Sequence, residues 1–212
     1  MRPIVFGALL LLAVVSASAS SAALFTVDLV AGSGDGLLTV DSATGLEWLD
    51  VTTTVGQAYS AVESGPFVGS LGFRFASAAE VEGLWINAGA EGTFTNDSSS
   101  NVSVLNYDAA ILLLDLMGCS QLVGCDGVGQ TWHIAMYGPS SHNVSAALIA
   151  ASLPPTSDAA MWLDFGQTVD FPRRADVGSY LVRAVPEAAA STMLALGVLG
   201  LMAYRFAAAV VR

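Results

Sequence analysis

Two cysteines, Cys119 and Cys125, lie six positions apart in the chain. A redox pair is usually separated by two residues, and a zinc site would need two further soft ligands at a suitable spacing. Neither pattern is present. The spacing, with glycines on both sides, instead predicts a local disulfide that closes a loop, a bond typical of exported proteins.

Aspartates are the candidate ligands for a cation. They occur near the first expected turns and again late in the chain, at Asp35, Asp41, Asp50, Asp164, Asp170 and Asp176. Calcium takes six to eight oxygen ligands from a preorganised loop, and no EF-hand spacing occurs here. A solvated acidic surface is therefore the favoured interpretation, with no metal ligand and no cofactor expected. Calcium-assisted sugar binding is the alternative, and its candidate ligand-binding residues are Trp162, Asp164, Asp170 and Asp176.

Tryptophan rings stack on sugars when they are exposed. All four tryptophans of the chain lie in segments with an apolar pattern, at Trp48, Trp85, Trp132 and Trp162. This pattern predicts core packing for each of them.

His133 lies between Trp132 and Ile134 in an expected strand, so a structural role is predicted for it. No serine stands in the glycine pattern of a nucleophile elbow, and no His-Glu-x-x-His motif occurs. The chain is therefore not expected to be an enzyme. A Ser-His-Asp triad assembled from distant positions, as in a secreted hydrolase, is the remote alternative.

The charge of the chain excludes one class of partner. It has 18 acidic residues against 7 basic ones, all arginine, and a net charge of −11 at pH 7. Such a surface repels phosphate backbones, so a nucleic-acid partner is not expected.

Residues 1–23 have the pattern of a secretory signal peptide. Arg2 supplies the positive start, residues 4–15 form an apolar run, and small residues follow with cleavage positions after Ala19 or Ala23. This order of features predicts export.

Residues 185–212 predict a membrane anchor. Residues 188–203 carry no charge, and a helix of this length spans about 24 Å, slightly less than a hydrocarbon core of about 30 Å. Arg205 and Arg212 follow, and positive charge beyond the span favours a cytoplasmic C-terminus. The preceding domain would then face outward.

The same segment resembles a known sorting signal. Val185, Pro186 and Glu187, the short glycine-bearing apolar stretch, and Arg205 and Arg212 are similar to the PEP-CTERM signal. The resemblance implies an exported bacterial protein, either anchored in the membrane or at the cell surface after processing. It also implies a membrane and an exosortase-type sorting machinery as partners, and an exopolysaccharide setting.

The middle of the chain, residues 24–184, is expected to form one domain. Strands at both ends with helices between them are typical of an α+β fold, with the terminal strands adjacent in one sheet. Strands are expected at residues 23–30, 37–41, 45–49, 131–137, 160–165 and 179–185. Helices are expected at residues 57–62, after a Ser77–Glu80 capping box, and at residues 107–117, with Asn106 as the N-cap and Gly118 as the end.

Three stretches of the middle resemble a bacterial family of exported domains similar to the Lcl C-terminal type. Residues 41–50 (DSATGLEWLD) match its D-x-x-T-G-L-x-W opening. Residues 72–81 (GFRFASAAEV) match an aromatic-Arg segment that leads into a helix, and residues 179–185 (SYLVRAV) match the closing strand. The resemblance implies a single C-type-lectin-like α+β domain between a signal peptide and a C-terminal transmembrane helix.

These features together predict an exported bacterial surface protein that is structural or adhesive within an exopolysaccharide matrix or biofilm. The alternative is a lectin-like carbohydrate-binding module, assisted by calcium. A secreted hydrolase is the remote third function.

Overall fold

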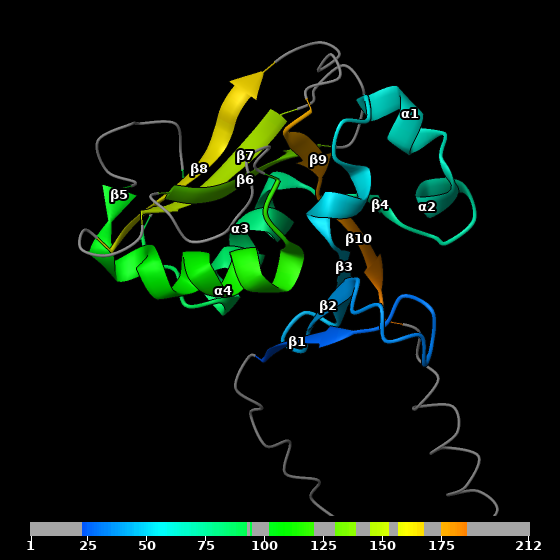
Figure 1. Ribbon diagram of the computed structural model, residues 1–212, viewed down its shortest axis with the longest axis horizontal. Helices are drawn as coiled ribbons and strands as arrows, with labels where there is room; N and C mark the ends of the chain where they lie inside the picture. The colour runs from blue at the N-terminus through cyan, green and yellow to red at the C-terminus, as the bar shows by residue number, and fades with distance from the viewer. Residues whose placement is uncertain are drawn as a thin grey trace, which may run out of the picture.

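The computed structural model describes residues 23–92, 94, 102–120, 130–138, 145–152, 157–167 and 175–185. Within them the chain forms two five-stranded sheets with helices packed against them (Figure 1). The predicted α+β class is therefore confirmed. The predicted signal peptide and sorting segment lie outside the described residues, apart from Ala23 and Val185 at their inner ends.

Sheet A has the strand order β1-β2-β3-β10-β4, and all its neighbouring strands are antiparallel. Its strands are β1 (Leu24–Val27), β2 (Leu38–Asp41), β3 (Leu46–Leu49), β4 (Arg74–Phe75) and β10 (Leu181–Ala184). The first and last strands share this sheet, as expected. The expected adjacency was wrong, because β2 and β3 lie between β1 and β10.

Sheet B has the strand order β5-β8-β7-β6-β9, in which only β6 and β9 are parallel. Its strands are β5 (Val102–Ser103), β6 (Gln130–Tyr137), β7 (Ser145–Ser152), β8 (Asp158–Gln167) and β9 (Val177–Ser179). The sequence predicts β6 and β8 but not β7. Alanine favours helix, so the alanine-rich β7 carries no strand signal of its own and forms because β6 and β8 pair with both its edges.

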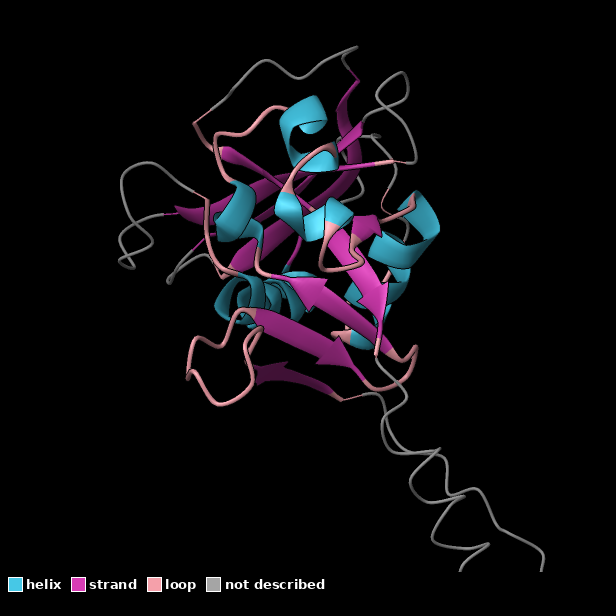
Figure 2. Ribbon diagram, turned by 90° about the vertical axis from the view of Figure 1, so that its right-hand side faces the viewer, coloured by secondary structure: helices cyan, strands magenta, loops and turns pink. Residues whose placement is uncertain are grey.

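Helices lie around and between the two sheets (Figure 2). They are η1 (Val51–Thr54), α1 (Tyr59–Glu63), α2 (Pro66–Gly69), α3 (Ala78–Asn87), η2 (Val104–Asn106) and α4 (Tyr107–Met117). Both halves of the predicted capping box form at α3, where Ser77 accepts from the Glu80 amide and Glu80 accepts from the Ser77 amide. α4 also has the predicted bounds.

Asn106 stands at the N-cap position of α4, as predicted, but its side chain does not cap the helix. The amide oxygen instead accepts from the backbone N–H of Glu91 at 2.8 Å, and the amide nitrogen donates to the Glu91 carbonyl at 3.1 Å. These bonds tie the loop after α3 to the start of α4. The prediction was wrong about the role because the competing partner is distant in sequence.

The strand predicted at residues 179–185 is divided between the two sheets. β9 ends at Ser179, Tyr180 lies between, and β10 begins at Leu181. The Tyr180 N–H donates to Met136 in sheet B at 2.8 Å, while its carbonyl accepts from Ala76 beside sheet A at 2.9 Å. One extended segment therefore belongs to both sheets.

An ion pair holds β10 to its neighbours. Arg183 lies directly opposite Glu47 of β3, and its Nε is 2.7 Å from the Glu47 Oε2. The same guanidinium donates to the Leu71 carbonyl at 3.0 Å and lies 4.5 Å above the centre of the Phe73 ring. With side chains only 20% and 10% exposed, the pair is shielded from water. Removing only one partner therefore costs more than breaking a surface ion pair does, because the other charge is left buried.

We expect Arg183→Met to lower the free energy of unfolding by about 3 kcal/mol, because it leaves the Glu47 carboxylate buried and unpaired. Replacing both partners, as in Glu47→Leu with Arg183→Met, is expected to restore much of that loss, because no buried charge remains. Chemical denaturation measures both effects.

Arg74→Met is the matched control, because Arg74 pairs with Glu80 but its side chain is 55% exposed. Its expected cost is below about 1 kcal/mol. Equal losses for the two arginine variants would show that the Arg183 pair has no special role.

Candidate functional site

The early aspartates, considered as cation ligands, already accept hydrogen bonds from other groups of the protein. Asp35 accepts from the backbone amides of Leu29, Val30 and Leu37, and Asp50 accepts from the amide and hydroxyl of Thr52. A hydrogen bond with Ser33, followed by these amides, keeps the pKa of Asp35 below its ordinary value. These carboxylates therefore shape turns.

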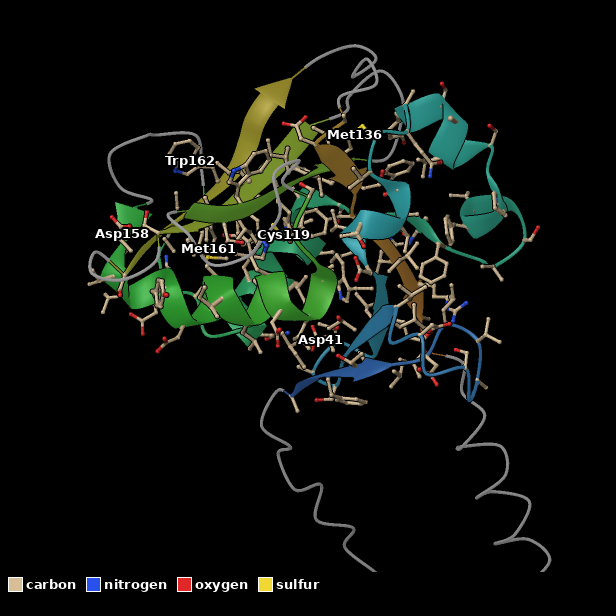
Figure 3. All side chains as sticks on the ribbon, viewed as in Figure 1. Asp41, Cys119, Met136, Asp158, Met161 and Trp162 are labelled. Atoms are coloured by element: carbon tan, nitrogen blue, oxygen red, sulfur yellow. The ribbon has the colours of Figure 1, made fainter. Side chains whose placement is uncertain are left out.

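Asp41 has a similar role but lies in the core. One carboxylate oxygen accepts from the Ala43 amide at 3.0 Å, and the other accepts from the side chain of Asn87 in α3 at 2.8 Å. Asp41 thus orders the turn between β2 and β3 and joins that turn to α3 (Figure 3).

The late aspartates are only partly within the described residues. Asp164 lies in β8 but its side chain is not described, and Asp170 lies outside the described residues. Asp176 lies in the turn before β9, where its backbone carbonyl accepts from the Ser120 hydroxyl at 2.7 Å. Among the described residues, no group of three or more histidine, cysteine or acidic side chains is placed to hold a metal.

Cys119 is disulfide-bonded and accepts a hydrogen bond from the Thr131 hydroxyl at 3.4 Å. It lies two residues after the end of α4, beside the first residues of β6 (Figure 3). Cys125, its predicted partner, lies outside the described residues.

His133 is fully buried in sheet B and uses both ring nitrogens within the core. Its Nδ1 lies 2.8 Å from the Gly118 carbonyl, which can only accept, so Nδ1 carries the proton. Its Nε2 lies 2.7 Å from the Tyr180 hydroxyl and accepts from it. Burial lowers the pKa of His133 to about 4 and raises that of Tyr180. This geometry supports the predicted structural role of His133. The other histidine of the chain, His142, lies outside the described residues.

Tyr180 is the residue that sequence analysis missed. It stood inside the predicted closing strand, residues 179–185, where nothing assigned a role to its side chain. Its ring contacts Trp48 edge-on, with centroids 6.1 Å apart, and it also contacts His133 at 5.6 Å. Only the tertiary structure brings these three rings together.

The tryptophans fall into two groups. Trp48 and Trp85 are 1% and 0% exposed, so core packing is confirmed for them. Trp132 and Trp162 are only partly buried and pack at the edge of a second apolar cluster. Figure 3 shows Trp162 on the face of sheet B opposite to Met161, which points toward α4.

Strand register places Trp132 and Trp162 on the same face of sheet B. Trp132 is paired with Ala150 of β7, which is paired with Ala160 of β8. Trp162 follows Ala160 by two positions, so alternation returns it to that face. It is paired there with Leu148. We call these five residues the tryptophan face, although Ala150 and Leu148 within it are buried, with exposures of only 5% and 9%.

A cavity of about 250 Å³ lies between α1, α2 and β4. It is lined by Tyr59, Glu63, Val68, Arg74, Phe75 and Ser77. The Tyr59 and Phe75 rings stack 3.9 Å apart, and Arg74 is engaged by Glu80. The hydroxyl of Ser77 in the lining donates to the Glu80 carboxylate at 2.9 Å.

Both described ends of the domain meet one turn. Ala23 and Ser42 exchange two hydrogen bonds, of 2.9 and 3.1 Å, and the Val185 amide donates to the Gly45 carbonyl at 2.9 Å. Figure 1 shows these ends beside sheet A, with sheet B on the far side of the molecule. The chain therefore enters and leaves the domain at the β2–β3 turn.

No protein-family model, curated protein or solved structure matches the chain. Of the described helices, none has both the length and the apolar character needed to cross a membrane. The predicted span at residues 188–203 lies outside that part of the chain.

The stability of the domain is expected to fall as the pH drops from 6.5 to 4. In the unfolded chain His133 binds a proton below about pH 6.5, whereas in the folded chain it stays neutral until about pH 4. Acid therefore favours unfolding. The expected loss is up to about 3 kcal/mol. Denaturation at a series of pH values measures it.

His133→Gln is the control, because an amide can donate to Gly118 and accept from Tyr180 without titrating. The difference between the two proteins isolates His133 from the carboxylates. Identical pH dependence between pH 6.5 and 4 would contradict the assignment of this acid sensitivity to His133.

Proposed function

We propose that the chain is an exported bacterial surface protein with one C-type-lectin-like domain, structural or adhesive in an exopolysaccharide matrix. The C-terminal segment that resembles the PEP-CTERM signal would sort it or anchor it. The observation that carries the proposal is the meeting of both described ends at the β2–β3 turn. A domain tethered there turns sheet B outward, away from the point of attachment.

The positions of the resembling stretches support the lectin-like part of the proposal. Residues 41–50 form the β2–β3 turn and β3, and residues 72–81 form β4 and the start of α3. Residues 179–185 hold the end of β9, Tyr180 and β10. These segments are far apart in the sequence, yet their strands are neighbours in sheet A.

The D-x-x-T-G-L-x-W stretch also has a physical explanation in this fold. Asp41 orders the turn, and Gly45 has a φ of +67°, which favours glycine. Trp48 then fills the core beside Tyr180. The motif therefore specifies a tight hairpin with a buried anchor.

A carbohydrate-binding module is the second candidate function. The tryptophan face favours it, because Trp132 and Trp162 are only partly buried and lie in sheet B, away from the attached ends. The early aspartates do not favour calcium assistance, since protein donors already occupy the carboxylates of Asp35, Asp41 and Asp50.

Fractionation of cells that produce the full-length chain tests export and anchoring. We expect the protein in the membrane or surface fraction, with its N-terminus cut after Ala19 or Ala23. A variant that ends at Val185 is expected in the medium, because it lacks the apolar segment. Full-length protein in the cytoplasm with residues 1–23 intact would refute the proposal.

Co-sedimentation of the detergent-solubilised full chain with exopolysaccharide from the producing cells tests the adhesive role. We expect saturable binding that a calcium chelator does not reduce. Binding that the chelator abolishes would favour the calcium-assisted module, and absence of binding would refute the adhesive role.

A further inference from the structure

The cavity between α1, α2 and β4 is built around a sharp turn between two short helices. α1 ends at Glu63, and α2 begins two residues later with Pro66, a residue that favours the first position of a helix. Gly65 lies between them, where a Cβ would be only 2.9 Å from the carbonyl oxygen of Ala61. The turn therefore requires glycine, and it places Glu63 and Val68 from different helices in one lining.

The floor of this cavity is apolar and its mouth is charged. Tyr59 and Phe75, whose rings stack on each other, are only 1% and 7% exposed, whereas Glu63 and Arg74 are exposed. The volume of about 250 Å³ is slightly below the roughly 300–1,000 Å³ of sites for drug-sized ligands. The cavity therefore suits a ligand with one six-membered ring and a polar group at the mouth.

The hydroxyl groups of the lining already have acceptors. The Tyr59 hydroxyl donates to the Gly138 carbonyl at 3.2 Å, and the Ser77 hydroxyl donates to Glu80. Arg74 donates to both carboxylate oxygens of Glu80, so its positive charge is balanced. A ligand that needs a cation to bind its own negative charge is therefore not favoured here.

Glu63 is the lining group with an unbalanced charge. Within the described part of the chain, its carboxylate has no hydrogen bond and no ion pair. Burial, and then the charge of Glu63, raise the pKa of Tyr59 to about 12, so the carboxylate acts on the floor of the cavity. A cationic ligand with N–H donors would satisfy it, and a protonated amine has both properties.

The charge of the whole molecule favours the same kind of ligand. The chain has 18 acidic residues, 7 basic ones and a net charge of −11. A polymer that carries many amines would be attracted to this surface at long range, whereas an anionic polymer would be repelled.

The cavity also lies where an attached domain could present it. β4 is at the edge of sheet A opposite to β1. Figure 1 shows α1 and α2 on the side of the molecule away from the described ends of the chain. Attachment through those ends would leave the cavity open to a polymer outside the cell.

Arg74 can also help to bind a sugar ring. A guanidinium has five N–H groups, and three of those of Arg74 donate to Glu80 and to the Phe75 carbonyl. The others remain available to hydroxyl groups of a ligand. An amino sugar brings hydroxyls, a ring and an amine together.

From these observations we infer that the cavity binds an amino sugar whose protonated amine donates to the Glu63 carboxylate. The ring would lie against Val68 and Phe75. This inference rests on the proposed function, since it names the class of exopolysaccharide that the exported domain would hold, one with free amino groups.

The test is titration calorimetry of the full-length protein in detergent with short glucosamine oligosaccharides and with N-acetylglucosamine oligosaccharides of the same length. We expect saturable binding of the free amines and at least tenfold weaker binding of the acetylated sugars, which carry no charge. Added salt is expected to weaken the binding, because the ion pair lies at an exposed mouth. Absence of binding, or equal affinity for the two series, would overturn the inference.

A lysine peptide with the same number of amines tests whether the sugar ring matters. We expect it to bind more weakly, because a flexible alkyl chain does not fill the cavity. Equal affinity for the peptide and for the glucosamine oligosaccharide would overturn the assignment to a sugar.

Variants locate the binding. Glu63→Gln is expected to weaken binding of the glucosamine oligosaccharide about tenfold without affecting the fold, because Glu63 is exposed. Asp115→Asn removes the same charge from an exposed position on α4 and is the matched control, expected to bind normally. Equal losses for the two variants would show that only the overall charge matters and would overturn the inference.

Val68→Phe tests the cavity itself. The larger side chain fills the space while Glu63 stays in place, so we expect it to abolish binding. Chemical denaturation checks that the variant is folded. Normal binding by folded Val68→Phe protein would show that the amine is held elsewhere.

The same measurements distinguish this inference from the proposed function. If wild-type protein co-sediments with exopolysaccharide but does not bind glucosamine oligosaccharides, the inference is wrong and the adhesive role stands. If it binds them through Glu63 but does not co-sediment with exopolysaccharide, the adhesive role fails and the amine site stands.

Discussion

Tyr180 is the residue at which the chain passes from sheet B into sheet A, and the rest of the fold depends on that crossing. Its N–H donates to Met136 and its carbonyl accepts from Ala76, so its backbone is bonded to both halves of the molecule. Its hydroxyl donates to His133, and its ring contacts Trp48 edge-on. Because buried polar groups cost free energy unless they are paired, the crossing is stable only when both sheets are in place.

The crossing also separates two parts of the domain with different roles. Sheet A holds both described ends of the chain through the β2–β3 turn, whereas sheet B lies away from those ends and carries Trp132 and Trp162. Residues 177–184 join the two sheets by one short extended segment. This segment leads directly to the described C-terminal end of the domain, and the Arg183–Glu47 pair holds it to β3.

Sequence reasoning identified the acidic residues but not what they bind. The sequence shows where carboxylate and amide groups occur along the chain. It does not show which groups they bind, because some of those partners are distant in the chain. Asp41 illustrates this, because one of its oxygens accepts from Asn87, which lies 46 positions away. Asn106 illustrates it too, since its amide bonds Glu91 instead of the helix that it precedes. Where a polar side chain has several possible hydrogen-bond partners, the tertiary structure decides which one it binds. A local sequence pattern cannot predict that partner.

The sequence by itself determined features whose causes lie within a few residues. The Ser77–Glu80 capping box, the β2–β3 turn and the end of α4 at Gly118 belong to this group, because neighbouring backbone groups satisfy one another locally. The tertiary structure alone decided that the alanine-rich β7 is a strand, that residues 179–185 are divided at Tyr180, and that two of the four tryptophans stay partly exposed. Each of these depends on strands that pair across long stretches of chain, and local preference is weaker than the hydrogen bonds and burial that such pairing brings.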